Sequence, residues 1–112
     1  MPSYNQFDII IVPFPFTDRN TSKRRPSLVL SNTYFNNIQH YICAMITTKS
    51  NPPWPGDIKI KDYKKSGLNH PSIIRFKLFT LDLRLIKRKL GGLSSRDKNS
   101  VRTTLNKILT NF

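Results

Sequence analysis

The sequence contains no glutamate and few residues of the kinds that hold metals or form disulfides. Its six acidic residues are all aspartate and stand against 19 lysines and arginines, so the formal net charge is +13. The two histidines, His40 and His70, lie far apart with no carboxylate at a ligand-like interval. A zinc or calcium site is therefore not expected. No glycine-rich phosphate loop precedes a helix, and dispersed aspartates give weak support for glycoside chemistry. We expect neither a metal nor a cofactor.

A single cysteine, Cys43, excludes an internal disulfide and favours a reducing compartment. Its apolar neighbours indicate a small buried side chain rather than a nucleophile. The N-terminus lacks a positive charge followed by a long apolar stretch, so no secretory signal is expected. The apolar run from Ile9 to Phe16 is too short to span a bilayer and contains two prolines. We expect a soluble, cytoplasmic protein without a membrane partner.

The excess of basic residues points to a polyanionic partner. It is spread from Arg19 to Lys107 rather than gathered in a tail, and self-repulsion of this size opposes folding unless an anion relieves it. Nucleic acid is the first choice, an anionic membrane the second and an acidic protein the third. The 112 residues predict one domain, 1–112, whose modest core favours self-association.

The apolar pattern predicts several short strands followed by one helix. The strands are expected at 7–12, 25–31, 41–47, 57–62, 72–76 and 78–81. The first is expected to be buried on both faces, and 57–62 alternates apolar and charged residues as a half-exposed edge strand does. The segment 84–89 has no clear preference, and Gly91-Gly92 is expected to end it.

The last element is predicted to be an amphipathic helix. Ser94 or Ser95 supplies its N-cap, and Asp97 lies in the first turn, where the helix dipole favours a negative charge. Helical spacing places one apolar face on Val101, Leu105, Ile108, Leu109 and Phe112. The fold class expected from these elements is mainly β, a small curled sheet with a C-terminal α-helix packed against it.

Basic residues gather where a polar loop enters the second strand, at Lys23, Arg24 and Arg25, followed by Pro26. Pro26 biases Arg25 towards an extended backbone, and a guanidinium can donate two parallel hydrogen bonds to a phosphate. A solvated basic turn would have the same sequence, and both interpretations stay open here.

Three further residues can carry phosphate chemistry or an ordinary structural role. Thr47 ends a strand with a hydroxyl that can donate to a phosphate oxygen, or that simply caps the backbone; Thr48 follows it. Arg75 lies within an apolar run, where a charge is costly without a purpose or a partner. A structural pair between Arg75 and an aspartate is the alternative to a role at a site.

Trp54 lies in a loop, 51–56, that three prolines stiffen. Its ring can stack on an unpaired base or pack over the mouth of a barrel. The sequence favours neither.

Taken together, these residues resemble the PemK/MazF family of toxins from type II toxin–antitoxin modules. The likeness begins with 7–18 and 23–31, continues through 44–47, 56–58, 67–68, 72–75 and 80–82, and closes with 92–94 and the final helix. Each fragment alone is a weak signal, but together they cover nearly the whole chain in the family's order.

The resemblance implies an SH3-like small β-barrel of the CcdB/PemK type, working as a homodimer and held inactive by an acidic antitoxin. The implied activity is metal-independent, sequence-selective cleavage of single-stranded RNA, in which the ribose 2′-oxygen attacks the adjacent phosphate. Arg25 matches the family's arginine before proline, Thr47 its catalytic threonine, and Arg75 an arginine that some members use. We expect Lys23, Arg24, Thr48, Lys77 and Trp54 to contact RNA.

One departure concerns Lys77, which stands where one branch of the family has an aspartate. The loss of this carboxylate leaves the general base unassigned. A lysine crowded by Arg75 can have a lowered pKa, but binding of backbone phosphate is the simpler role for Lys77. His70 can titrate usefully, or be an ordinary exposed histidine.

Two other functions fit parts of the sequence. A non-enzymatic toxin that binds a protein such as DNA gyrase would share the fold, since fold alone does not settle function. A nucleic-acid-binding barrel with impaired catalysis would explain Lys77. The pairing of Arg25 with Thr47 argues against the gyrase alternative, because such a binder has no use for a phosphate-cleaving site.

Overall fold

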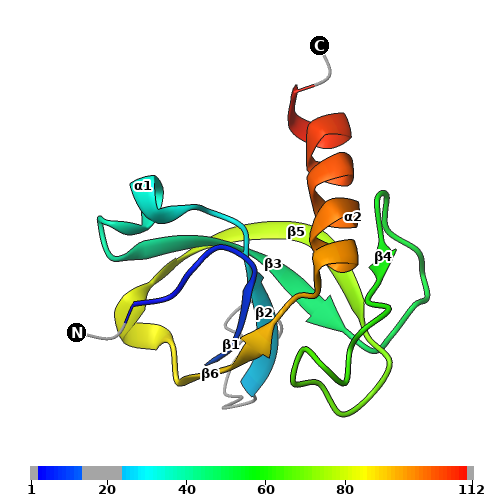
Figure 1. The fold of residues 1–112 in the computed structure, drawn as a ribbon, viewed down its shortest axis with the longest axis horizontal. Coiled ribbons are helices and arrows are strands. Elements are labelled where there is room, and N and C mark those ends of the chain that lie inside the picture. Colours follow the sequence, from blue (N-terminus) through cyan, green and yellow to red (C-terminus); the bar gives the residue numbers. More distant parts are fainter. Residues whose placement is uncertain (1–2, 14–23, 111–112) are drawn as a thin grey trace.

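The computed structural model describes residues 3–13 and 24–110. Within these ranges the chain forms a curled antiparallel sheet followed by a C-terminal helix (Figure 1). The strands are β1 (Asp8–Pro13), β2 (Arg24–Val29), β3 (His40–Thr47), β4 (Ile58–Lys59), β5 (Ile73–Asp82) and β6 (Arg88–Gly92). The helical elements are α1 (Thr33–Asn36), a 3₁₀ turn η1 (Leu83–Leu85), α2 (Ser95–Leu105) and a π-helical turn η2 (Asn106–Thr110).

The described strands make one six-stranded sheet with the order β4-β5-β3-β2-β1-β6. Neighbours in this order are antiparallel throughout. Register shifts between Ile9 and Ile10 and between Cys43 and Met45 mark bulges, which increase local twist and bend a sheet. This architecture confirms the predicted fold class, a mainly β protein whose curled sheet forms a small barrel followed by a C-terminal helix.

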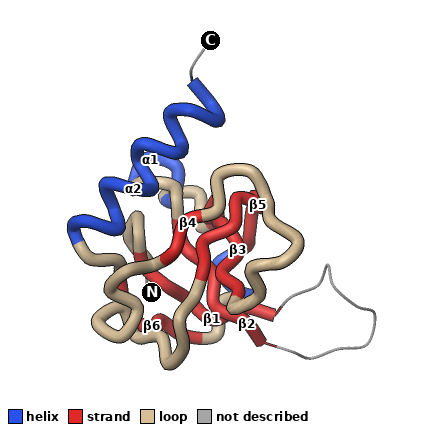
Figure 2. Tube along the Cα trace, turned by 90° about the vertical axis from the view of Figure 1, so that its right-hand side faces the viewer, coloured by secondary structure: helices blue, strands red, loops and turns tan. Residues whose placement is uncertain are grey.

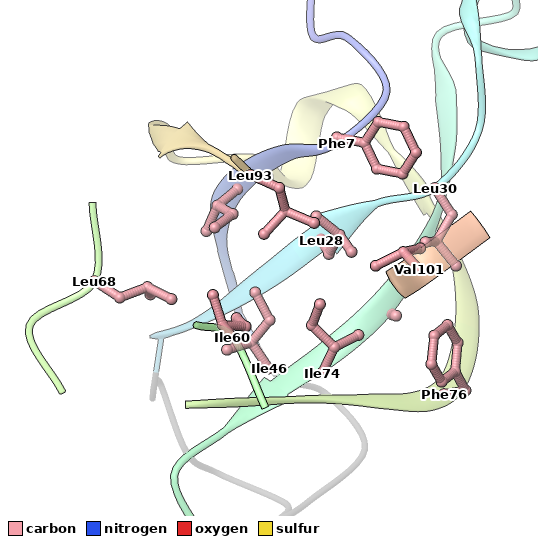
Figure 3. Close-up of a cluster of buried hydrophobic side chains, with 12 residues drawn as sticks. Phe7, Leu28, Leu30, Ile46, Ile60, Leu68, Ile74, Phe76, Leu93 and Val101 are labelled. Carbon is pink, nitrogen blue, oxygen red and sulfur yellow. The ribbon is translucent and has the colours of Figure 1, made fainter. Parts of the chain in front are cut away.

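Each face of the sheet carries its own apolar cluster, because directly paired residues share a face. Leu28 and its partner Ala44 belong to the first cluster, which includes Val101 of α2 (Figure 3). Val29 and its partner Cys43 belong to the second. Both clusters take residues from β1, which is therefore buried on both faces, as the sequence predicted.

Cys43 is the small buried side chain expected. It is fully buried, and burial raises the pKa of its thiol to about 12, so it is protonated and unreactive at neutral pH.

Two predictions about elements need correction. Residues 72–76 and 78–81 belong to one continuous strand, β5, and the predicted strand 57–62 is reduced to the two residues of β4 at the sheet edge. Gly91 and Gly92 are the last two residues of β6 and so end the strand that contains Arg88 and Lys89, as predicted; the backbone approaches closely at Gly91.

The helix prediction is confirmed at its start and corrected at its end. The Ser94 hydroxyl accepts the N–H of Asp97, so Ser94 is the N-cap. Val101 is fully buried, whereas Ile108 and Leu109 are 44% and 51% exposed. Figures 1 and 2 give the reason, since the end of the helix extends beyond the sheet. Phe112 lies outside the described residues.

Candidate active site

Strand pairing brings Arg25 and Thr47 to the same end of the sheet although they are far apart in the sequence. Ser27 of β2 pairs with Met45 of β3 in antiparallel register. Arg25 lies two residues before Ser27, and Thr47 lies two residues after Met45. Because alternate residues of a strand share a face, Arg25 and Thr47 lie on one face of neighbouring strands. Both are at the same end of the sheet, where β2 begins and β3 ends.

The Thr47 side chain is held in a defined position. It is 9% exposed, and its Oγ1 accepts the backbone N–H of Lys49 at 3.1 Å. A hydroxyl has two lone pairs and one proton. With one lone pair occupied by Lys49, the hydroxyl proton can still donate to an anionic oxygen, which is the chemistry expected of Thr47 at a phosphate site.

Arg75 shares this face, because it pairs with Met45 from the other side of β3. Its guanidinium is bound to a carboxylate, which confirms the alternative that Arg75 forms a structural pair with an aspartate. Nη2 and Nε donate to the Asp57 oxygens at 2.8 and 3.1 Å, and Nη2 also donates to the Pro52 carbonyl at 3.1 Å. These hydrogen bonds raise the pKa of Arg75 and lower that of Asp57.

Sequence reasoning missed Asp57, which is the carboxylate that neutralises Arg75. Asp57 also accepts the backbone N–H of Trp54 at 3.0 Å, so it ties the proline loop to β5. The sequence did indicate that Arg75 needs a partner, because its charge lies inside an apolar run. With six aspartates dispersed along the chain, it did not indicate which of them is the partner. With its pKa lowered by Arg75, Asp57 is a weak general base.

Trp54 and Lys77 meet at the edge of the same region. The Lys77 ammonium lies 4.8 Å from the centre of the Trp54 ring, within the range of a cation–π contact. Trp54 is 40% exposed, so its ring is accessible from solvent. Lys77 is two residues beyond Arg75 in β5 and is exposed.

The remaining predicted contact residues lie around the strand ends. Arg24 is exposed at the start of β2, opposite Pro13 of β1. As the neighbour of Arg25 in the strand, it lies on the opposite face of the sheet. Thr48 is exposed just beyond β3. Lys23 lies outside the described residues.

Every aspartate in the described ranges already has a partner. Four form ion pairs, namely Asp8 with Lys89, Asp57 with Arg75, Asp62 with Arg96 and Asp82 with Arg84. The fifth, Asp97, accepts the backbone N–H groups of Lys61 and Asp62. Hydrogen bonds from Arg84 lower the pKa of Asp82 to about 2, and those from Arg96 lower the pKa of Asp62. The described residues thus bring no unengaged carboxylate to Arg25 and Thr47.

The described residues also contain no group of three or more histidine, cysteine or acidic side chains placed to hold a metal ion. No helix in these ranges is long and apolar enough to cross a membrane.

Comparison with protein families gives a match to the PemK-like, MazF-like toxins of type II toxin–antitoxin systems, over residues 5–109. The chain belongs to this family. No curated protein matches the sequence.

Solved structures of MazF proteins share the fold at low sequence identity. MazF from Deinococcus radiodurans is 18% identical with a TM-score of 0.74, over 97% of this chain and 98% of that one. The Mycobacterium tuberculosis toxin MazF-mt6 is 20% identical with a TM-score of 0.71, over 89% and 93%. A mycobacterial endoribonuclease solved in complex with its cognate antitoxin is 15% identical with a TM-score of 0.75, over 97% and 95%.

Proposed function

We propose that this toxin is an endoribonuclease that cleaves single-stranded RNA, messenger RNA included, at selected sequences without a metal. The observation that carries the proposal is the position of Arg25 and Thr47 on one face of neighbouring strands, at the same end of the sheet. Membership of the MazF family supports it, as does the name endoribonuclease carried by a structural neighbour.

The proposed reaction is internal transesterification. The ribose 2′-oxygen loses its proton to a base and attacks the adjacent phosphorus, and the bond from phosphorus to the 5′-oxygen breaks. The leaving oxygen takes a proton, so the products are a 2′,3′-cyclic phosphate and a 5′-hydroxyl. The transient pentavalent phosphorane carries extra negative charge. Hydrogen-bond donors and cations held in fixed positions stabilise this charge.

The proposed roles follow from the chemistry of the side chains. Arg25 donates to the phosphate oxygens, because a guanidinium stays charged at any working pH. The Thr47 hydroxyl donates a second hydrogen bond. Arg75 contributes positive charge and holds the loop that carries Trp54. Since Asp57 neutralises Arg75, we expect its effect on the rate to be smaller than that of Arg25.

The surrounding residues are proposed to bind the rest of the RNA. Lys23, Arg24 and Lys77 would contact backbone phosphates, Thr48 would donate a hydrogen bond, and Trp54 would stack on an unpaired base. Assigning Lys77 to binding predicts that Lys77→Ala weakens affinity more than the single-turnover rate at saturation.

We also propose a homodimer that acts in the cytoplasm and is inhibited by an acidic antitoxin. The net charge of +13 suits RNA and an acidic protein segment alike. Structures of the Deinococcus radiodurans relative include a MazE–MazF complex, 18% identical to this chain with a TM-score of 0.73.

The test is incubation of the purified protein with single-stranded RNA in EDTA. We expect cleavage to persist in chelator and to leave cyclic-phosphate ends, detected by mass spectrometry. Arg25→Ala should lower the single-turnover rate by about 10²–10³-fold, the usual cost of one donor to a developing anion. Arg102→Ala, which removes the same charge from α2, should leave the rate within about twofold, as expected of a surface substitution.

The other outcomes identify the alternatives. Intact RNA with tight, salt-sensitive binding would indicate a barrel that binds nucleic acid without cleaving it. Inhibition of DNA gyrase without any effect on RNA would indicate a toxin that binds a protein.

A further inference from the structure

Two neighbouring hollows lie near the end of β3, and of the residues assigned above only Thr48 lines them. Their volumes are about 280 and 400 Å³, and both are lined by Thr48 and Ser72. The two hollows thus share part of their lining, and together we call them the Thr48 groove. Its floor includes Ile60 and Leu68, which belong to the first apolar cluster; Figure 3 shows Leu68 at one end of that cluster.

The groove carries positive charge without a matching negative charge. Lys59 and Lys61 line one hollow, and Arg88 lines the other together with His70. The side chains of Lys59, Lys61 and Arg88 form no ion pair or hydrogen bond with any residue of the described ranges. No aspartate lines either hollow. Because no aspartate neutralises these three charges, an anion can bind in the groove.

The wall of the groove is built by close backbone contact rather than by a loose loop. At Gly67 a Cβ atom would lie 2.5 Å from the Leu90 carbonyl oxygen of β6, and Gly67 has a φ of +95°. The backbone N–H of Leu68 donates to the Tyr63 carbonyl at 3.0 Å. Ser72 donates its hydroxyl to the His70 carbonyl at 2.8 Å. The groove is therefore preorganised, which lowers the entropy cost of binding.

We propose that the Thr48 groove binds the nucleotides of single-stranded RNA that flank the cleaved phosphate. The apolar floor would take a base, and Lys59, Lys61 and Arg88 would take backbone phosphates. Thr48 directly follows Thr47, so the groove begins where the candidate active site ends. The strand would pass around the end of β3, with nucleotides on one side of the scissile bond at Lys59 and Lys61, and those on the other at Arg88. This inference rests on the proposed function.

The test uses single-stranded RNA with every 2′-oxygen methylated, which binds but cannot undergo the proposed attack. We compare Lys59→Ala/Lys61→Ala with Lys64→Ala/Lys65→Ala, a control that removes the same charge from exposed lysines outside the groove. Loss of two phosphate contacts should flatten the slope of log affinity against log salt by about 1.4, since each contributes about 0.7 for a single strand. Affinity near 0.15 M salt should fall about tenfold, while the control should change little. Circular dichroism establishes that both variants are folded.

The two hollows can be separated with oligonucleotides extended to one side of the cleavage position only. Lys59→Ala/Lys61→Ala should weaken binding of RNA extended in one direction, and Arg88→Ala should weaken binding of RNA extended in the other. Lys87→Ala, the exposed neighbour of Arg88, is the matched control.

Equal losses of RNA affinity in the groove variant and its control would overturn the proposal. They would indicate that RNA responds to the overall positive charge of the protein rather than to a specific site. Loss of binding to poly-glutamate with unchanged binding to RNA would also overturn it and would assign the groove to an acidic protein. If unmodified RNA is not cleaved but binding of methylated RNA still depends on Lys59 and Lys61, the proposed reaction is wrong and the proposed RNA-binding groove is supported. If cleavage is found and the groove variant binds like its control, the groove alone fails.

Discussion

At the scale of single residues, the pairing of Arg75 with Asp57 decides what the candidate site contains. The Arg75 side chain is 9% exposed and that of Asp57 17%, so each charge depends on the other. Burying a charge without a partner is costly, which is why the sequence could predict that Arg75 needs either a role or a carboxylate. It could not say which aspartate, because that depends on how the proline loop folds back onto β5.

The first prediction is that Asp57→Asn lowers the melting temperature by several degrees at neutral pH, because it leaves the Arg75 guanidinium without its counter-charge. The pKa of Asp57 is lowered in the folded state, relative to about 3.9 in an unfolded chain. The ion pair therefore stabilises the fold above that value, and the stabilisation is lost as the pH falls below it. The difference in melting temperature should be largest above about pH 5 and shrink towards pH 2.

Thermal unfolding followed by circular dichroism from pH 2 to 7 measures this difference. Asp82→Asn is the control, because Asp82 pairs with an Arg84 side chain that is 88% exposed, and such surface pairs contribute little. A difference between wild type and Asp57→Asn that does not change with pH would contradict the role assigned to this ion pair.

At the scale of elements, the close approach between the turn at 66–67 and β6 holds the end of the sheet together. A Cβ atom on Gly91 would collide with the Ser66 carbonyl oxygen, whereas one on Gly92 would lie 3.5 Å from the Phe7 carbonyl oxygen, an ordinary contact. The sequence showed two adjacent glycines and suggested an end to the segment. Only the packing of two backbones against each other explains why the first of them must lack a side chain.

We therefore predict that Gly91→Ala destabilises the protein by about 1–3 kcal/mol, the usual cost of inserting a methyl group into a packed contact. Gly92→Ala should stay within about 0.5 kcal/mol. Urea unfolding of the two variants measures the difference. Equal effects would mean that strand propensity, rather than the contact with Ser66, sets the cost.

At the scale of the whole molecule, the basic surface and the exposed end of the helix are the two features that the proposed partners would cover. The net charge of +13 already counts the six aspartates, so it is positive charge that no acidic residue of the chain can balance. Ile108 and Leu109 stay exposed where the helix extends beyond the sheet (Figure 1). The proposed homodimer would have an apolar surface to cover there, and an anionic partner would relieve the charge.

Self-repulsion at this charge predicts that salt stabilises the free protein. The melting temperature should rise by several degrees between 20 mM and 500 mM sodium chloride, because screening weakens repulsion over distances beyond about 10 Å. Differential scanning fluorimetry measures it. A melting temperature that falls with salt would mean that the ion pairs outweigh the repulsion.

The sequence by itself determined the fold class, the basic character, the capped final helix and the family, because these depend on composition, on local periodicity and on motifs in a set order. The tertiary structure decided the rest. Strand register placed Arg25 and Thr47 on one face at the same end of the sheet, loop folding made Asp57 the partner of Arg75, and the turn packed on β6 formed part of the Thr48 groove. Each joins residues distant in the chain, and such contacts depend on the complete set of packing choices rather than on any local pattern.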